Sequence, residues 1–215
     1  MANLKAEITR LRQEQEKSLS EEVRRVLQRS VQRLVESELA ESATGVGEVF
    51  PAFSLPNPGG RAVSSEELLQ QGHLVVCFYR GGWCPYCNLE LRAYQAVLGE
   101  IQQQGANLIA ISPQLPDESL TTAAKGSLTY QVLCDTGNSL ASHLGLVFEL
   151  APAVADIYRS VGYDLERING NSTWALPIPA TYVVRKDGVI VDAFVQPDHS
   201  IRKEPSEVIE ILKQL

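Results

Sequence analysis

The chain has 215 residues, of which 44% are hydrophobic and 21% charged, the composition of an ordinary globular protein with one well-filled domain and an attached element. A formal net charge of −7 argues against a nucleic-acid or anionic-membrane binder, because such proteins normally present a basic surface. No apolar run reaches the roughly 18 residues of a membrane span, and the charged N-terminus lacks a signal-peptide core. These features predict a soluble, cytoplasmic protein.

Residues 1–41, which we call the N-terminal arm, are polar but carry a recurring apolar stripe that predicts one or two helices. A break is expected near residues 18–21, where Ser18 and Glu21 have the spacing of a capping box. The stripe is equally compatible with packing on the chain's own domain and with a dimer contact, because an apolar face does not identify its partner. We expect the arm to carry no chemistry of its own.

After a linker at residues 42–47, the main domain is expected to span residues 46–215 and to alternate strands with helices. It starts with a short hairpin around Asn57-Pro58-Gly59-Gly60 and a helix over residues 66–71 that Ser64 or Ser65 caps. The following predicted elements are strands at 74–79, 108–111 and 132–134 and helices from the cysteine motif to Gly105, at 116–125 and at 139–144. This alternation indicates parallel strands with helices on both faces of the sheet.

The alternation stops at residues 146–176, which we interpret as an insertion beside the site with a helix near residues 153–161. Residues 180–185 and 189–194 then flank Lys186-Asp187-Gly188, and two strands joined by an Asp-Gly turn form an antiparallel hairpin. A closing helix is predicted over residues 205–215. The fold class is therefore α/β, with a central mixed sheet.

Two cysteines occupy the junction between the predicted strand at 74–79 and the helix that follows. At this position Cys84 is the helix N-cap, where unpaired backbone N–H groups and the macrodipole favour a thiolate. Pro85 suits the first helical position, and Cys87 returns to the same face one turn later. Cys87 can thus attack a mixed disulfide formed at Cys84, so the motif indicates redox chemistry.

A structural zinc site is the main alternative for this cysteine pair. Such a site needs four ligands, but Cys77 and Cys134 lie singly within apolar strands and read as inert core. The three histidines are isolated from any recognisable catalytic relay. We therefore expect no metal and no other cofactor.

Other polar residues near the motif are open to two interpretations. Arg80 either adds positive charge near the thiolate or is a solvated loop residue. Glu90 and Arg92 are expected on the exposed side of the helix. Pro179 directly precedes a strand, where it is an entry residue and where a cis peptide bond would matter if present.

The sequence Trp83-Cys84-Pro85-Tyr86-Cys87 after an apolar strand, together with Pro179-Ala180-Thr181 before the Lys-Asp-Gly hairpin, resembles the thioredoxin superfamily. More narrowly, residues 46–215 resemble its peroxiredoxin-like branch, the alkyl hydroperoxide reductase and thiol-specific antioxidant family. The resemblance implies a thioredoxin-like fold, with Cys84 as the exposed nucleophile and Cys87 as resolving thiol. It also implies that Pro179 is a cis-proline facing the pair.

Three departures from the peroxiredoxin pattern affect the expected activity. When Cys84 is matched to the peroxidatic cysteine, the family's proline, threonine and arginine positions hold Cys77, Gly81 and Pro179. Without the threonine and arginine, the only visible donor for O–O cleavage is Arg80. The thioredoxin pattern is incomplete as well, because its buried acid is replaced by Phe78.

We therefore expect a thiol-disulfide oxidoreductase, with a thioredoxin-dependent hydroperoxide peroxidase as the alternative and a non-enzymatic redox sensor as a further one. The expected partners are a disulfide or hydroperoxide substrate and a thiol donor such as a thioredoxin or glutathione. A homodimer through the N-terminal helices is an additional possibility.

Overall fold

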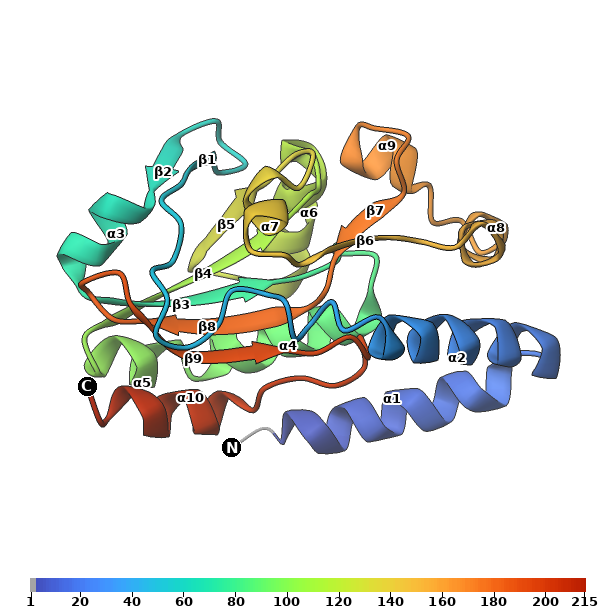
Figure 1. The fold of residues 1–215 in the computed structure, drawn as a ribbon, viewed down its shortest axis with the longest axis horizontal. Helices are drawn as coiled ribbons and strands as arrows, with labels where there is room; N and C mark the ends of the chain where they lie inside the picture. Colours follow the sequence, from blue (N-terminus) through green and yellow to red (C-terminus); the bar gives the residue numbers. More distant parts are fainter. Residues whose placement is uncertain (1–2) are drawn as a thin grey trace.

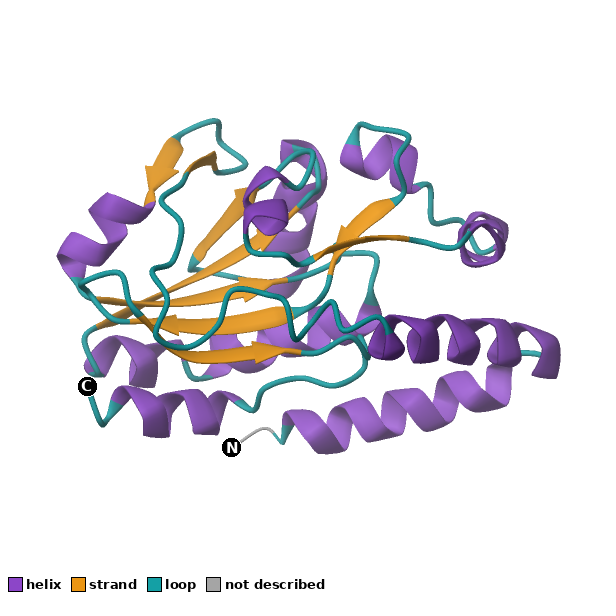
Figure 2. Ribbon diagram, viewed as in Figure 1, coloured by secondary structure: helices purple, strands orange, loops and turns teal. Residues whose placement is uncertain are grey.

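The computed structural model describes residues 3–215 and contains a central five-stranded sheet (Figures 1 and 2). The strand order is β5-β4-β3-β8-β9. Its strands are β3 (His73–Phe78), β4 (Ala106–Ser112), β5 (Gln131–Cys134), β8 (Ala180–Val184) and β9 (Ile190–Val195). Strands β3, β4 and β5 pair in parallel, whereas β8 pairs antiparallel with both β3 and β9. The predicted mixed sheet is confirmed.

Helices cover both faces of this sheet. One face is packed by α4 (Pro85–Ala96), α5 (Leu98–Gln103), α6 (Pro116–Gly126) and α10 (Pro205–Leu212), and the other by α3 (Ser65–Gln71) and α7 (Ser139–His143). Successive β3 side chains join opposite cores, so the strand is apolar throughout its length. The helix expected to run unbroken to Gly105 is interrupted at Val97, which separates α4 from α5.

Two small antiparallel pairs lie outside the main sheet. Strands β1 (Ser54–Pro56) and β2 (Ala62–Ser64) form the predicted hairpin, and the Ser64 side chain caps α3 by accepting the Glu67 N–H at 3.1 Å. Strands β6 (Val147–Glu149) and β7 (Ala175–Pro177) pair at the base of the 146–176 segment. Between them lie the short helices α8 (Pro152–Ser160) and α9 (Leu165–Asn169).

The N-terminal arm forms two helices, α1 (Leu4–Ser18) and α2 (Glu21–Glu36). The break falls where predicted, but the capping residue is Ser20 and not Ser18. Ser20 accepts the Val23 N–H at 3.3 Å, whereas the Ser18 hydroxyl donates back to a carbonyl of its own helix. Figure 1 shows the two helices as a hairpin at one end of the molecule, with α1 along α4 and α2 beside α8. The arm therefore packs on its own domain.

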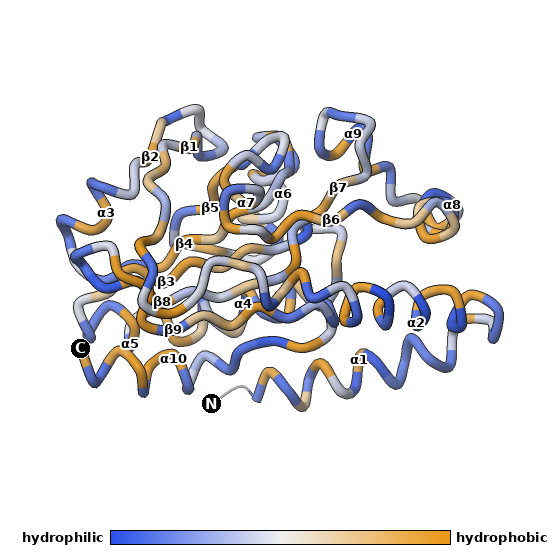
Figure 3. Tube along the Cα trace, in the orientation of Figure 1, coloured by the Kyte–Doolittle hydropathy of each residue, from blue (hydrophilic) through white to orange (hydrophobic). Residues whose placement is uncertain are grey.

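Helix α2 buries its apolar side less completely than the helices that cover the sheet. Figure 3 shows hydrophobic and hydrophilic residues alternating along it, yet none of its 16 residues is fully buried. Its stripe residues, such as Leu27 and Val31, are half-buried because they border cavities. Among the described residues, no helix combines the length and apolarity needed to cross a membrane.

Candidate active site

The two motif cysteines begin helix α4. Cys84 is its N-cap, with φ −84° and ψ 114°, and Pro85 occupies the first turn as predicted. Only 1% of the Cys84 surface and none of the Cys87 surface is exposed. Both are free thiols in this structure. The pair is therefore buried at the end of the sheet, although sequence reasoning placed Cys84 as an exposed nucleophile.

The loop before Cys84 leaves no room for larger side chains at two positions. Gly81 has φ +148°, and a Cβ there would lie 2.3 Å from the Trp83 indole nitrogen. A Cβ on Gly82 would lie 2.1 Å from the Thr122 hydroxyl oxygen. A threonine at position 81 is thus excluded by the packing of Trp83, which explains one departure from the peroxiredoxin pattern.

Several groups act in opposite directions on the Cys84 thiol. Burial raises its pKa, but a hydrogen bond from the Cys87 thiol and the charges of Arg80 and Arg202 outweigh that effect and lower the pKa to about 6. The Cys87 backbone N–H contributes in the same direction. Cys84 is therefore a thiolate at neutral pH.

Cys87 lies in a different environment one turn further along α4. Burial and the neighbouring Cys84 raise its pKa well above the ordinary value, although Arg202 opposes this. The Arg202 guanidinium donates to the Cys87 sulfur at 3.4 Å and pairs with Glu90 at 2.7 Å. Both members of this ion pair are almost fully buried. Cys87 therefore stays protonated while Cys84 is ionised.

Glu90 was expected on the exposed side of α4, and this prediction is wrong. Only 2% of its surface is exposed, and burial raises its pKa to about 7, against the opposing effect of Arg202. The sequence contains no local signal for this contact, because Arg202 lies 112 residues away in the loop before α10. Arg92 is exposed, as predicted.

Arg80 is buried, so its interpretation as a solvated loop residue is wrong. Its guanidinium lies 4.7 Å from the Trp83 ring centroid and 5.6 Å from that of Tyr158. It also donates a hydrogen bond to the Tyr158 hydroxyl. Tyr158 belongs to α8, so the 146–176 segment holds Arg80 in place beside Cys84.

Cys84 opens into a cavity of about 210 Å³ between the main domain, α8 and the arm. Its aromatic walls are Trp83, Tyr86, Tyr158 and Tyr163. The arm contributes Gln15, Leu19 and Leu27, among others, and the Tyr86 hydroxyl donates to the Gln15 side-chain oxygen at 2.7 Å. The arm, which was expected to take no part in the chemistry, thus walls the cysteine site.

Pro179 directly precedes β8, as predicted, and it is buried. No peptide bond among the described residues is cis, so the cis bond implied by the resemblance is wrong for this structure. The flanking backbone is held extended, because the Gln196 N–H donates to the Pro179 carbonyl at 3.2 Å and Ile178 is tied to Leu146 at 2.7 Å. Pro179 lines a 30 Å³ cavity with Arg80 and is absent from the Cys84 cavity.

His199 is a site residue that sequence reasoning set aside as isolated. It lines the Cys84 cavity with its ring 5.6 Å from that of Tyr86. Burial and nearby arginines lower its pKa well below the ordinary value, so it is neutral.

Within residues 3–215 no cluster of three or more potential metal ligands occurs. Cys77 and Cys134 are buried in the sheet, and burial raises the pKa of each.

Comparison with known proteins identifies the fold and the family. The model of the AhpC/TSA family matches residues 46–193. The chain belongs to the AhpC/TSA family. A putative peroxiredoxin Bcp of Helicobacter pylori is 25% identical over 149 residues, covering 69% of this chain and 86% of the relative. A putative peroxiredoxin of Mycobacterium tuberculosis is 26% identical over 147 residues, covering 68% and 82%.

Solved structures agree with this AhpC/TSA assignment at the level of the fold. Peroxidoxin BcpB of Mycobacterium tuberculosis superposes with a TM-score of 0.63 at 18% identity, covering 80% of this chain and 98% of that one. Peroxiredoxin Q of Xanthomonas campestris gives 0.60 at 19% identity, covering 79% and 97%. The protein is therefore a peroxiredoxin-like oxidoreductase with a thioredoxin-like fold. These relatives favour the peroxidase alternative over disulfide exchange, and the N-terminal arm lies outside the matched family segment.

Proposed function

We propose that this protein reduces hydroperoxides, with the Cys84 thiolate as nucleophile and Cys87 as the resolving thiol. The observation that supports this most strongly is the Cys84 thiol at the N-terminus of α4, whose pKa is lowered to about 6 in the presence of two buried arginines. A thiolate at neutral pH is the reactive form of cysteine. The family relationship supplies the reaction class.

In the first step, the Cys84 sulfur attacks one peroxide oxygen. An S–O bond forms and the O–O bond breaks, which leaves a sulfenic acid and an alkoxide that takes a proton to become the alcohol. Arg80 lines the same cavity and carries a fixed positive charge near the leaving oxygen. We assign to Arg80 the stabilisation that a threonine and a late-strand arginine give in other peroxiredoxins.

In the second step, Cys87 attacks the Cys84 sulfur. An S–S bond forms and the S–O bond breaks, and the released hydroxide takes up the Cys87 proton to give water. Arg202 lies 3.4 Å from the Cys87 sulfur and is positioned to stabilise the thiolate that forms there. The cycle closes when an external thiol donor returns two electrons to the disulfide.

The test is stopped-flow oxidation of the reduced protein by hydrogen peroxide and by cumene hydroperoxide, compared with reduction of insulin disulfides. We expect fast peroxide-dependent oxidation that is lost in Cys84→Ser, and a single turnover without disulfide in Cys87→Ser. Insulin reduction should be slow, because a protein disulfide has to reach a sulfur that the arm covers. Insulin reduction without peroxide consumption would instead support disulfide exchange, and the absence of both would support the sensor.

A further inference from the structure

The burial of Cys84 restricts which electron donor can reach the site. The Cys84 cavity is closed on one side by Gln15 and Leu19 of the arm and on another by Tyr163 of the 146–176 segment. Thiol-disulfide exchange requires the donor sulfur to touch the disulfide. With the arm in place, a small thiol can enter through a cavity, whereas a folded protein has to displace the arm first.

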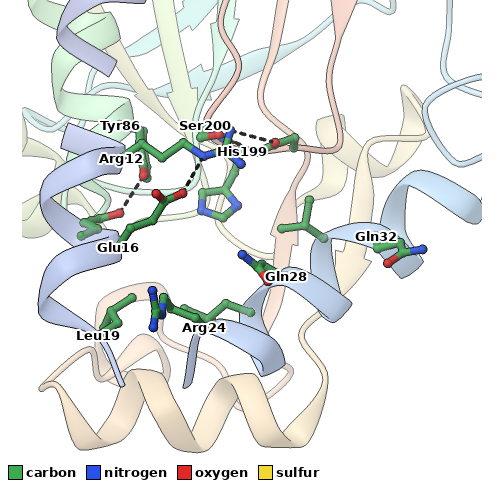
Figure 4. A pocket seen from close by; sticks show the side chains of 13 residues that line it. Arg12, Glu16, Leu19, Arg24, Gln28, Gln32, Tyr86, His199 and Ser200 are labelled. Atoms are coloured by element: carbon green, nitrogen blue, oxygen red, sulfur yellow. Dashed lines mark hydrogen bonds and ion pairs between the residues drawn. The ribbon is translucent and has the colours of Figure 1, made fainter. Parts of the chain in front are cut away.

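Such a cavity exists between the two arm helices and the main domain. A second cavity of about 250 Å³ adjoins the Cys84 cavity, and both are lined by Gln15, Tyr86 and His199. In Figure 4, Tyr86 and His199 lie at one end of this second cavity and Arg24 at the other. The side chains of Gln15, Tyr86 and His199 therefore lie between the second cavity and the Cys84 cavity, and a ligand in the second cavity lies next to the cysteine site.

The charged residues that line the second cavity are of both signs. Arg24 lines the second cavity, and its Nε atom is buried with no hydrogen-bond partner among residues 3–215. Arg12 is already paired, at 3.5 Å from Glu16 and 4.0 Å from Asp198. Arg24 is thus the cation available to an incoming carboxylate, because its buried Nε–H has no partner and an unsatisfied buried donor is costly.

The other residues that line the second cavity offer an anionic, an amide and an apolar contact. Glu16, which is also paired with Arg12, lines the cavity with a carboxylate that can accept from an ammonium group. Gln28 offers a side-chain amide for peptide groups. Leu27 and Val31 supply an apolar wall for a short aliphatic backbone. The cavity therefore presents a cation, an anion, an amide and an apolar surface within one small volume.

We propose that this cavity binds a small zwitterionic peptide thiol of the glutathione class, which serves as the electron donor for the cysteine pair. Its carboxylate binds Arg24, and its sulfur points past Tyr86 and His199 toward Cys84. The proposal rests on the proposed function only for the origin of the disulfide that the thiol reduces.

The reduction takes place in two exchanges. The first donor thiolate attacks one sulfur of the Cys84–Cys87 disulfide, which forms a mixed disulfide and releases the other protein sulfur as a thiolate. A second donor thiolate attacks the donor sulfur of the mixed disulfide and releases the second protein thiolate. Two donor thiols thus become one donor disulfide, and the protein pair gains two electrons and two protons.

The first experiment follows reduction of the disulfide after its formation with diamide, so that no peroxide is needed. The donors are glutathione and its diethyl ester, which keeps the thiol but loses both carboxylates. We expect glutathione to react about tenfold faster with the wild type, and Arg24→Gln to remove that preference. Arg25→Gln is the matched control, because Arg25 is exposed on the same helix and paired with Glu21. It should keep the wild-type preference.

The second experiment is independent of redox chemistry. S-methylglutathione, which cannot reduce a disulfide, should bind the reduced wild-type protein and Arg25→Gln in calorimetry, and binding should weaken about tenfold in Arg24→Gln. Equal binding to all three proteins, or none at millimolar ligand, overturns the proposal even if peroxidase activity is present. Faster reduction of the wild-type disulfide by a bacterial thioredoxin than by glutathione at equal thiol concentration overturns it as well.

Discussion

Cys84 and Cys87 are one helical turn apart and equally buried, yet the pKa of the first is lowered and that of the second is raised. Burial acts in the same direction on both, so it cannot account for the difference. Arg80 and Arg202 also act in the same direction on both, because they lower each pKa. What differs is the effect of each thiol on the other: the Cys87 thiol lowers the pKa of Cys84, whereas Cys84 raises that of Cys87. The neighbouring Cys87 thiol and the N-cap position of Cys84 therefore both favour ionisation of Cys84 over Cys87.

Replacing each cysteine by serine should have the largest effect and tests the difference between Cys84 and Cys87 directly. Cys84→Ser should reduce peroxide consumption to the level of buffer, because a serine hydroxyl does not ionise near neutral pH. Cys87→Ser should still form the sulfenic acid once. Mass spectrometry of the dimedone-treated proteins checks both variants: an adduct at position 84 is expected in Cys87→Ser and none in Cys84→Ser. An adduct at position 87 in the wild type would reverse the two roles.

Removing the charge beside Cys84 should have the next largest effect. Arg80→Leu should lower the second-order rate constant for peroxide by about 10²–10³-fold, the typical cost of losing one donor to a developing oxyanion. The pKa of Cys84 should rise in the same variant, since the Arg80 charge helps to lower it. A rate constant unchanged in stopped flow would show that Arg80 does not contact the peroxide.

The ion pair beside Cys87 can be broken from one side or from both. Glu90→Gln leaves the buried Arg202 charge without its partner and should lower the free energy of unfolding by about 3 kcal/mol. The double variant Glu90→Gln, Arg202→Met removes both charges and should recover part of that loss. Urea unfolding measures each value. A double variant no more stable than the single one would show that the pair itself stabilises the fold.

The pH dependence of the reaction reports the Cys84 thiolate directly. The rate constant for peroxide should rise with pH through about 6 and then level off, falling about tenfold for each unit below 6. Because the folded pKa is below that of a free thiol, ionised Cys84 stabilises the folded state at alkaline pH, and this contribution is lost as pH falls through 6. Rapid alkylation by iodoacetamide across pH 4–9 should show the same midpoint. A midpoint above 8 would contradict it.

Tyr158→Phe should have the smallest effect. It removes the hydroxyl that accepts from Arg80 but keeps the ring that packs on Trp83. The rate constant should fall a few-fold, in line with a hydrogen bond to a charged group that water partly replaces. Its diagnostic sign is a small upward shift of the pH midpoint, which a purely structural defect would not produce. A change in KM for the thiol donor alone would argue against this role.

The sequence was sufficient to predict the sheet and the cysteine junction because both depend on local patterns. Short apolar runs between helical patterns predicted β3, β4 and β5, and an Asp-Gly turn predicted the β8–β9 hairpin. The AhpC/TSA relationship confirms the fold. A cysteine followed by proline after a strand was enough to place Cys84 at an N-cap.

The remaining features of the site depend on contacts between distant parts of the chain. Glu90 meets Arg202, and Gln15 meets Tyr86, across separations of 112 and 71 residues. No periodicity or spacing encodes such contacts. The glycine at position 81 was read as a missing donor, although its identity is dictated by the indole of Trp83. Close packing, and not only chemistry, thus determines which motif residues this site retains.

The location of the N-terminal arm separates two properties that many enzymes combine in the same residues. The reactivity of Cys84 is set by α4, Arg80 and Arg202, whereas one wall of its cavity is built by α1 and α2, outside the matched AhpC/TSA segment. Substitutions in the arm should therefore alter which molecules arrive without altering how strongly the sulfur attacks them. The arm is thus a natural place to redesign the selectivity of the site while α4, Arg80 and Arg202 are left unchanged.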